Sequence, residues 1–85
     1  MRFVRTDSFR KHYAKLPPEI RKKVIRQITY LQQDIRHPGL YSKKMVGQGD
    51  IWEARIDIHY RLTFQIVGDV IVLRKVGTHE IYRKP

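Results

Sequence analysis

The side chains best suited to chemistry are arginines on predicted strands and a histidine near the end of the chain. Arg55 and Arg61 flank a short turn, and His79 lies in the closing segment KVGTHEIYRKP, residues 75–85. Guanidinium groups suit phosphate because their planar fork holds two of its oxygens. An imidazole beside such cations can move the protons of RNA cleavage, in which a 2′-hydroxyl attacks phosphorus and a 5′-oxygen leaves. No metal is obligatory in that scheme.

A predicted hairpin brings the two arginines together. Apolar and polar residues alternate with period two over 51–56 and over 60–67, which is typical of strands with one buried face. A three-residue loop over 57–59 pairs Trp52 with Phe64 and keeps apolar residues opposite apolar ones, whereas a two-residue loop would mix the faces. We therefore expect this register, with Trp52 in the core rather than stacked on a base.

In this register Arg55 lies directly opposite Arg61 on the polar face. Like charges directly opposite destabilise a sheet, so an anion bound between the arginines is one explanation for the pair. The other explanation is that both arginines splay into solvent and keep this face soluble. The neighbouring row is predicted to hold Glu53, Thr63 and Arg74.

The last hairpin is predicted to turn at Gly68-Asp69. Glycine occupies the first central position, as a type II′ turn requires, between a strand over 60–67 and one over 70–76. The register that follows has three pairs: Val67 with Val70, Thr63 with Arg74, and Arg61 with Val76. This register places Lys75 on the apolar face, where its stem would have to snorkel past the helix edge.

Gly77 determines whether the closing segment can turn back toward the sheet. A glycine at the sheet edge lets the chain turn or bulge, which would carry His79 to the Arg55/Arg61 pair. The alternative is a frayed end, because chain termini fray unless they are tied down. We expect only residues 83–85 to be loose.

Two helices are predicted ahead of these strands. After a short strand over 2–5, Thr6 or Asp7 can cap a first helix, and Pro17-Pro18-Glu19 ends it and begins a second. The second helix carries one apolar stripe: Ile20, Val24, Ile28, Leu31 and Ile35. A loop over 40–50 holds one further short strand around 44–46. The expected fold class is α+β: an antiparallel sheet of about four strands with an N-terminal helical hairpin on one face.

Composition limits the partners. The chain has 85 residues, no cysteine and a formal net charge of +10, so we expect one domain over 1–85 and a polyanionic partner. His12, His37 and His59 are scattered singly, and their spacing predicts no metal site; we also expect no cofactor. Neither a signal peptide nor a membrane segment is evident, which favours a cytoplasmic protein without membrane contact.

The chain resembles the RelE/ParE superfamily of bacterial toxins from type II toxin–antitoxin modules. The likeness covers essentially the whole chain and rests on the order of four stretches: LPPEIRKKV, DIWEARID, YRLTF and VGTHEIY. The resemblance implies a RelE-like fold. For the RelE-like branch it implies a metal-independent endoribonuclease that cleaves messenger RNA at the ribosomal A site and so inhibits translation.

The resemblance also implies roles for single residues. Arg61 of YRLTF would stabilise the transition state, and His79 of GTHEIY would act as general acid or base. Tyr82 would stack on or orient a base, and Glu53 would be a further catalytic group. The remaining candidates for RNA or phosphate contacts are Arg55, Arg74, Lys75, Arg21, Lys22, Lys23 and Arg26, the last four as a docking surface on the second helix or as a merely solvated face.

The resemblance implies partners and an alternative function. Expected partners are a cognate antitoxin, the ribosome with its RNA, and messenger RNA, and the free chain is expected as a monomer or weak homodimer. The ParE branch poisons DNA gyrase with the same fold and without nuclease activity. Gyrase inhibition, or an inactive nucleic-acid-binding relative, therefore stays open as the alternative.

Overall fold

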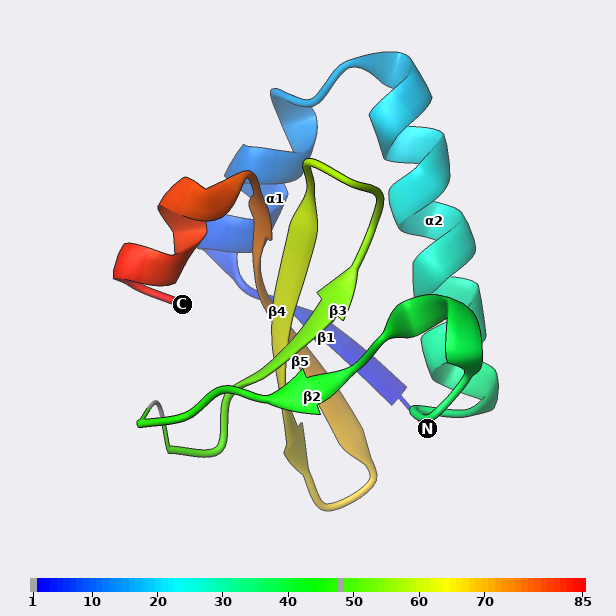
Figure 1. Ribbon diagram of the computed structural model, residues 1–85, viewed down its shortest axis with the longest axis vertical. Helices are drawn as coiled ribbons and strands as arrows, with labels where there is room; N and C mark the ends of the chain where they lie inside the picture. The colour runs from blue at the N-terminus through cyan, green and yellow to red at the C-terminus, as the bar shows by residue number, and fades with distance from the viewer. Residues whose placement is uncertain (1, 48) are drawn as a thin grey trace.

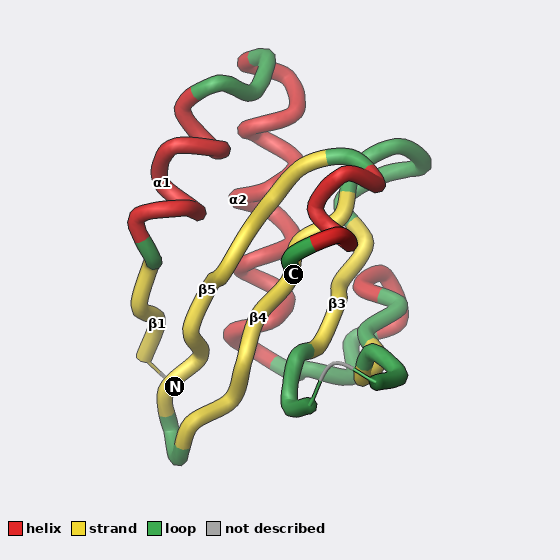
Figure 2. The backbone as a smooth tube through the Cα atoms, turned by 90° about the vertical axis from the view of Figure 1, so that its left-hand side faces the viewer, coloured by secondary structure: helices red, strands yellow, loops and turns green. Residues whose placement is uncertain are grey.

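The computed structural model describes residues 2–47 and 49–85; Met1 and Gln48, the latter within the loop expected over 40–50, lie outside the described residues. Two helices pack on one face of a sheet (Figures 1 and 2). In chain order the elements are β1 (Arg2–Arg5), α1 (Asp7–Ala14), α2 (Pro18–Gln33), the 3-10 helix η1 (Pro38–Leu40), β2 (Lys43–Lys44), β3 (Trp52–Arg55), β4 (Arg61–Val67), β5 (Val70–Gly77) and the 3-10 helix η2 (His79–Arg83).

The predicted class, α+β with a helical hairpin on one face of the sheet, is confirmed, but the sheet itself differs from the prediction. The described residues form five strands in the order β1-β5-β4-β3-β2, not about four. β1 runs parallel to β5, from Arg2 beside Val70 to Arg5 beside Leu73, so the sheet is mixed and not purely antiparallel. The sequence of a four-residue strand such as β1 does not show which strand it pairs with. That pairing depends on the path of the whole chain.

The helices begin where the sequence predicts. Thr6 caps α1, since its Oγ1 accepts a hydrogen bond from the main-chain N–H of Phe9 at 3.1 Å. Pro18 occupies the first turn of α2, where a missing N–H costs nothing. Val24 and Leu31 of the predicted stripe are fully buried against the sheet. Among the described residues, no helix is long and apolar enough to cross a membrane.

The β3–β4 hairpin has the predicted register. Trp52 pairs with Phe64, and their rings stack with centroids 6.2 Å apart. The turn is closed by Asp57, whose Oδ1 accepts hydrogen bonds from the main-chain N–H groups of His59 and Tyr60, both at 2.9 Å. At the outer edge, β2 covers Lys43–Lys44 and so lies slightly earlier than the strand expected over 44–46.

The β4–β5 hairpin begins as predicted and then departs from the prediction. Gly68 has a φ of 61°, and Val67 pairs with Val70, as a turn at Gly68-Asp69 requires. Past Phe64 the register shifts by one residue at a β-bulge. The predicted pairs beyond this point, Thr63 with Arg74 and Arg61 with Val76, are therefore wrong. The observed partners are Lys75 for Thr63 and Gly77 for Arg61.

A distant threonine accompanies this bulge. The Oγ1 of Thr6 donates to the main-chain oxygens of Leu73 at 3.0 Å and Arg74 at 2.7 Å, at the point where β1 passes into α1. After the bulge Val76, and not Lys75, takes the next core position and is 1% exposed. The bulge thus removes the conflict of a lysine on the apolar face.

The C-terminal residues fold back over the open face, the face of the sheet opposite α1 and α2 (Figure 2). Gly77 needs no unusual backbone here. Instead it leaves space for Ile81, because a Cβ at Gly77 would lie 3.0 Å from Cγ2 of Ile81. Pro85 is buried, so the expectation that residues 83–85 are loose is wrong for its last member.

Candidate active site on the open face of the sheet

A groove of about 450 Å³ crosses the open face over β3 and β4. Its lining residues are Tyr41, Ser42, Lys43, Glu53, Arg55 and Arg61. A second groove of about 370 Å³ adjoins it, because both are lined by Lys43 and Glu53, and it continues to Tyr82. Glu53 therefore lies where the two grooves meet.

Glu53 is held by a neighbouring strand. Lys43 stands opposite Glu53 in the β2–β3 pair, and its Nζ lies 3.3 Å from Oε1 of Glu53. The Glu53 side chain is 14% exposed, whereas that of Lys43 is 71% exposed. The carboxylate is thus fixed on the floor of the groove, while the ammonium group at its rim stays accessible to a ligand.

Tyr82 reaches this carboxylate from η2. Burial raises the pKa of the Tyr82 hydroxyl to about 12, and Glu53 acts in the same direction, since it accepts a hydrogen bond from the phenol and repels a phenolate. Arg61 acts on the same hydroxyl in the opposite direction. Glu53, Arg61 and Tyr82 therefore meet at one point, and Tyr82 is a neutral hydrogen-bond donor at neutral pH.

Arg61 is oriented by the turn that precedes it. Its Nη1 donates to the main-chain oxygens of Asp57 and, at 2.9 Å, of Tyr60. Asp57 is in turn tied to α2, because its Oδ2 accepts a hydrogen bond from Nζ of Lys23 at 3.2 Å. Burial acts to raise the pKa of Asp57, but hydrogen bonds from His59, Tyr60 and Lys23 outweigh it and hold the pKa below its usual value.

The expected pairing of Arg55 with Arg61 is confirmed. Their head groups have different partners, however. The guanidinium of Arg55 lies 5.1 Å from the ring centroid of Tyr41, while that of Arg61 turns to the loop carbonyls. The two like charges diverge, which relieves their repulsion, yet both still line the same groove.

His79 lies at the margin of this arrangement. It is exposed and lines neither groove. Its ring is tilted by 55° against that of Tyr82, with centroids 5.5 Å apart. The structure therefore places His79 beside Tyr82, whereas the sequence predicted it close to the Arg55/Arg61 pair.

Two residues of β5 that were predicted to contact phosphate, Arg74 and Lys75, do not line the groove. Arg74, the residue at the bulge, donates through Nη1 to Gln65 at 2.6 Å and through Nε to the main-chain oxygen of Pro85 at 3.1 Å. Lys75 lines a different pocket, between α1 and η2. The bulge explains both departures, because it breaks the alternation from which their directions were predicted.

The cationic residues of α2 lie on the other side of the sheet from the groove (Figure 1). Lys23 is paired with Asp57, so it is not free for an outside phosphate as the prediction supposed. Lys22 and Arg26 are exposed and Arg21 is half-buried. Arg21, Lys22 and Arg26 do not line the groove, although they can still contact a large partner.

Sequence reasoning missed Lys43, Tyr41 and Asp57. Lys43 and Tyr41 were assigned to an uninformative loop, and Asp57 to a turn. The one signal available for Lys43 was its place directly before the short strand expected over 44–46. Gln27, a further buried polar residue, holds the main-chain oxygens of Gly39 at 2.9 Å and Arg55 at 2.7 Å, and so aligns β3 beneath the groove.

Comparison with solved structures shows which class of protein the fold resembles. A YoeB/ParE toxin from Agrobacterium tumefaciens superposes with a TM-score of 0.81 at 16% identity, over 93% of this chain and 99% of that one. The RelB–RelE antitoxin–toxin complex of Methanococcus jannaschii gives 0.76 at 26% identity over all of both chains, and the intact E. coli RelBE complex gives 0.74 at 19% over 91% and 94%. No protein-family model and no curated protein sequence matches the chain.

The resemblance to the RelE/ParE superfamily is thereby confirmed by structure. The chain has the RelE-like fold, and its structural neighbours are RelE, YoeB and ParE toxins of toxin–antitoxin systems.

Proposed function

We propose that the chain is the toxin of a toxin–antitoxin module and that it cleaves messenger RNA in the ribosomal A site. The observation that carries this proposal is the position of Glu53 where the two adjoining grooves meet, with Arg61 lining one groove and Tyr82 the other. A carboxylate, a guanidinium and a neutral phenol at one point are a base, a phosphate ligand and a hydrogen-bond donor. An open groove on a strongly cationic chain suits an RNA strand.

In the proposed reaction Glu53 accepts the proton of a ribose 2′-hydroxyl. The 2′-oxygen then bonds to the adjacent phosphorus and the bond from phosphorus to the 5′-oxygen breaks. His79 gives a proton to that leaving oxygen, so the products are a 2′,3′-cyclic phosphate and a 5′-hydroxyl. Arg61 and Lys43 stabilise the added charge on the phosphate, and Tyr82 orients the Glu53 carboxylate through its hydrogen bond to it.

The proposed partners are ribosomal RNA, messenger RNA and an antitoxin. Exposed cations on the far face of the molecule, Lys22 and Arg26, are suited to ribosomal RNA, while the groove takes the messenger. The two RelB–RelE neighbours support an antitoxin as a further partner. A groove this open leaves room for the ribosome to complete the site, so the isolated chain should act weakly on free RNA.

Induced expression of the chain tests the class of target. The proposal predicts growth arrest with an immediate loss of protein synthesis, relieved by Arg61→Ala and by Glu53→Gln, while DNA synthesis continues. The ParE-like alternative predicts gyrase–DNA cleavage complexes and a DNA-damage response. Growth arrest that persists in both variants would overturn the nuclease proposal, and a small acidic partner gene beside this one would support the toxin class.

A further inference from the structure

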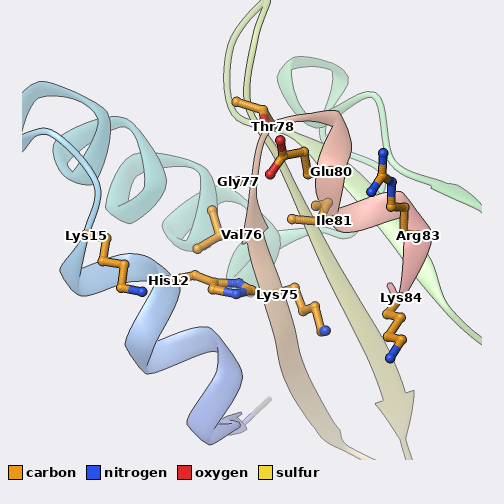
Figure 3. Close-up of a pocket in the computed structure, with 10 residues that line it drawn as sticks. All are labelled: His12, Lys15, Lys75, Val76, Gly77, Thr78, Glu80, Ile81, Arg83 and Lys84. Carbon is orange, nitrogen blue, oxygen red and sulfur yellow. The ribbon is translucent and has the colours of Figure 1, made fainter.

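A pocket of about 470 Å³ lies between α1 and η2, at the edge of β5 (Figure 3). β1 ends at Arg5, which pairs with Leu73, so residues 74–77 of β5 have no strand beside them on this edge. α1 borders the pocket on one side and η2 on the other (Figure 3). The pocket shares no lining residue with the candidate active site.

The pocket is rich in uncompensated positive charge. Its lining includes Lys15 from α1, Lys75 from β5, and Arg83 and Lys84 from the C-terminal segment. Among the described residues, none of these four makes an ion pair within 4 Å, whereas Lys23, Lys43 and Lys44 elsewhere do. One carboxylate, Glu80, lines the pocket. An anion bound here would therefore reduce the repulsion among these positive charges.

His12 supplies a second, independent observation. Its Nδ1 is buried and has no hydrogen-bond partner among the described residues. Burial, followed by the charges of Lys75 and Lys15, lowers the pKa of His12. Figure 3 shows His12 directed from α1 toward Lys75 on the strand. Because Nδ1 itself has almost no accessible surface, a ligand in the pocket would contact the other atoms of the imidazole ring.

The shape and lining indicate the size of the ligand. A concave site of this volume falls in the range of small-molecule sites, roughly 300–1,000 Å³. Val76 and Ile81 line the pocket but are only 1% and 7% exposed, so little of either side chain is open to a ligand. Unpaired cations around a concave site of this volume fit a small molecule that bears a phosphate.

We propose that this pocket binds a phosphate-bearing ligand of nucleotide size, with Lys15, Lys75 and His12 around the phosphate. The phosphate can belong to a free nucleotide or to the phosphorylated end of an RNA strand, and both present the same group. The site does not depend on the proposed nuclease function, because it uses other residues on another edge of the sheet.

Titration of the ¹⁵N-labelled chain with AMP, inorganic pyrophosphate and adenosine tests the proposal. AMP and pyrophosphate should shift the amide signals of residues 75–81 and raise the pKa of His12, while adenosine should do neither. A short oligoribonucleotide with and without a 5′-phosphate separates the two sources of the group. Shifts spread over the basic face of α2, or no shifts with AMP and pyrophosphate, would overturn the proposal.

Two double variants that each lose two positive charges distinguish binding in the pocket from general attraction to a basic surface. Lys15→Gln with Lys75→Gln should weaken AMP binding about tenfold, as expected for the loss of hydrogen bonds to a charged group. Lys11→Gln with Lys22→Gln removes the same charge from exposed positions outside the pocket and should change binding by about twofold or less. Equal losses of AMP affinity in the two variants would contradict a specific binding site in this pocket.

Discussion

Asp57 and Arg61 are joined through the main chain: the carbonyl oxygen of Asp57 accepts a hydrogen bond from Nη1 of Arg61. The carboxylate of the same Asp57 closes the β3–β4 turn and pairs with Lys23 of α2. One residue therefore connects the helix, the turn and the guanidinium at the groove. Asp57 is a positioning residue in this account, since it acts through Arg61.

Substitution of Asp57 should separate its two roles. Asp57→Ala removes the acceptor of the turn and the ion pair together, and we expect a loss of about 1–3 kcal/mol in the free energy of unfolding. Asp57→Asn keeps an acceptor for the turn and loses only the ion pair, which should cost about 1 kcal/mol or less. Urea unfolding measures both, with Lys23→Met as the matched control for the ion pair. Equal losses in the Ala and Asn variants would show that the turn hydrogen bonds contribute nothing.

Acid should weaken the fold through Asp57. Its pKa in the folded chain lies below the ordinary value of 3.8, so its contribution to stability is complete above pH 3.8 and is lost as pH falls through the lower folded pKa. Stability measured by urea between pH 5 and the acid limit should decline in the wild type. Asp57→Asn should flatten that decline, and an unchanged pH dependence would contradict the assignment.

Alkali should act through Tyr82 in the opposite sense. Its folded pKa of about 12 exceeds the ordinary value of 10.0, so the neutral phenol stabilises the fold below pH 10 and this contribution is lost as pH rises toward 12. The difference in tyrosinate absorbance between wild type and Tyr82→Phe should titrate near 12. A difference that titrates near 10 would mean that the hydroxyl is not buried against Glu53.

The contact between Gly77 and Ile81 should limit substitutions at the end of β5. Gly77→Ala places a Cβ 3.0 Å from Cγ2 of Ile81, so η2 must shift, and we expect a destabilisation of about 1–3 kcal/mol. Leucine is not branched at Cβ and therefore lacks the Cγ2 methyl. Ile81→Leu combined with Gly77→Ala should therefore recover part of the loss in thermal unfolding. Additive effects of the two changes would argue against a steric contact between them.

The parts predicted from sequence are those governed by local pattern. Alternation and turn length were enough for the pairing of Trp52 with Phe64 and for the turn at Gly68-Asp69. Proline and threonine placed the helix starts at Thr6 and Pro18. Each of these features depends on residues close together in the chain, and their physical cause is visible in the sequence.

The parts that were missed depend on contacts between distant segments. The bulge at Arg74 accompanies a hydroxyl 68 residues away, and it redirects both Arg74 and Lys75. Pro85 is held in place because Thr63 donates a hydrogen bond to its main-chain oxygen at 2.8 Å. The sequence of the C-terminal residues does not predict this hydrogen bond. For the same reason the candidate site gained Lys43, which the sequence placed only in a loop.

Mapping of messenger RNA ends in a translation extract tests the central claim most directly. Ribosomes are stalled with a known codon in the A site, and the purified chain is added. We predict a cut within that codon and a loss of roughly 10²–10³ in cleavage rate for Arg61→Ala. Arg2→Ala, an equal loss of charge at an exposed arginine far from the groove, should cut as the wild type does. Cleavage by Arg61→Ala at the wild-type rate, or no A-site cut by the wild type, would contradict the account.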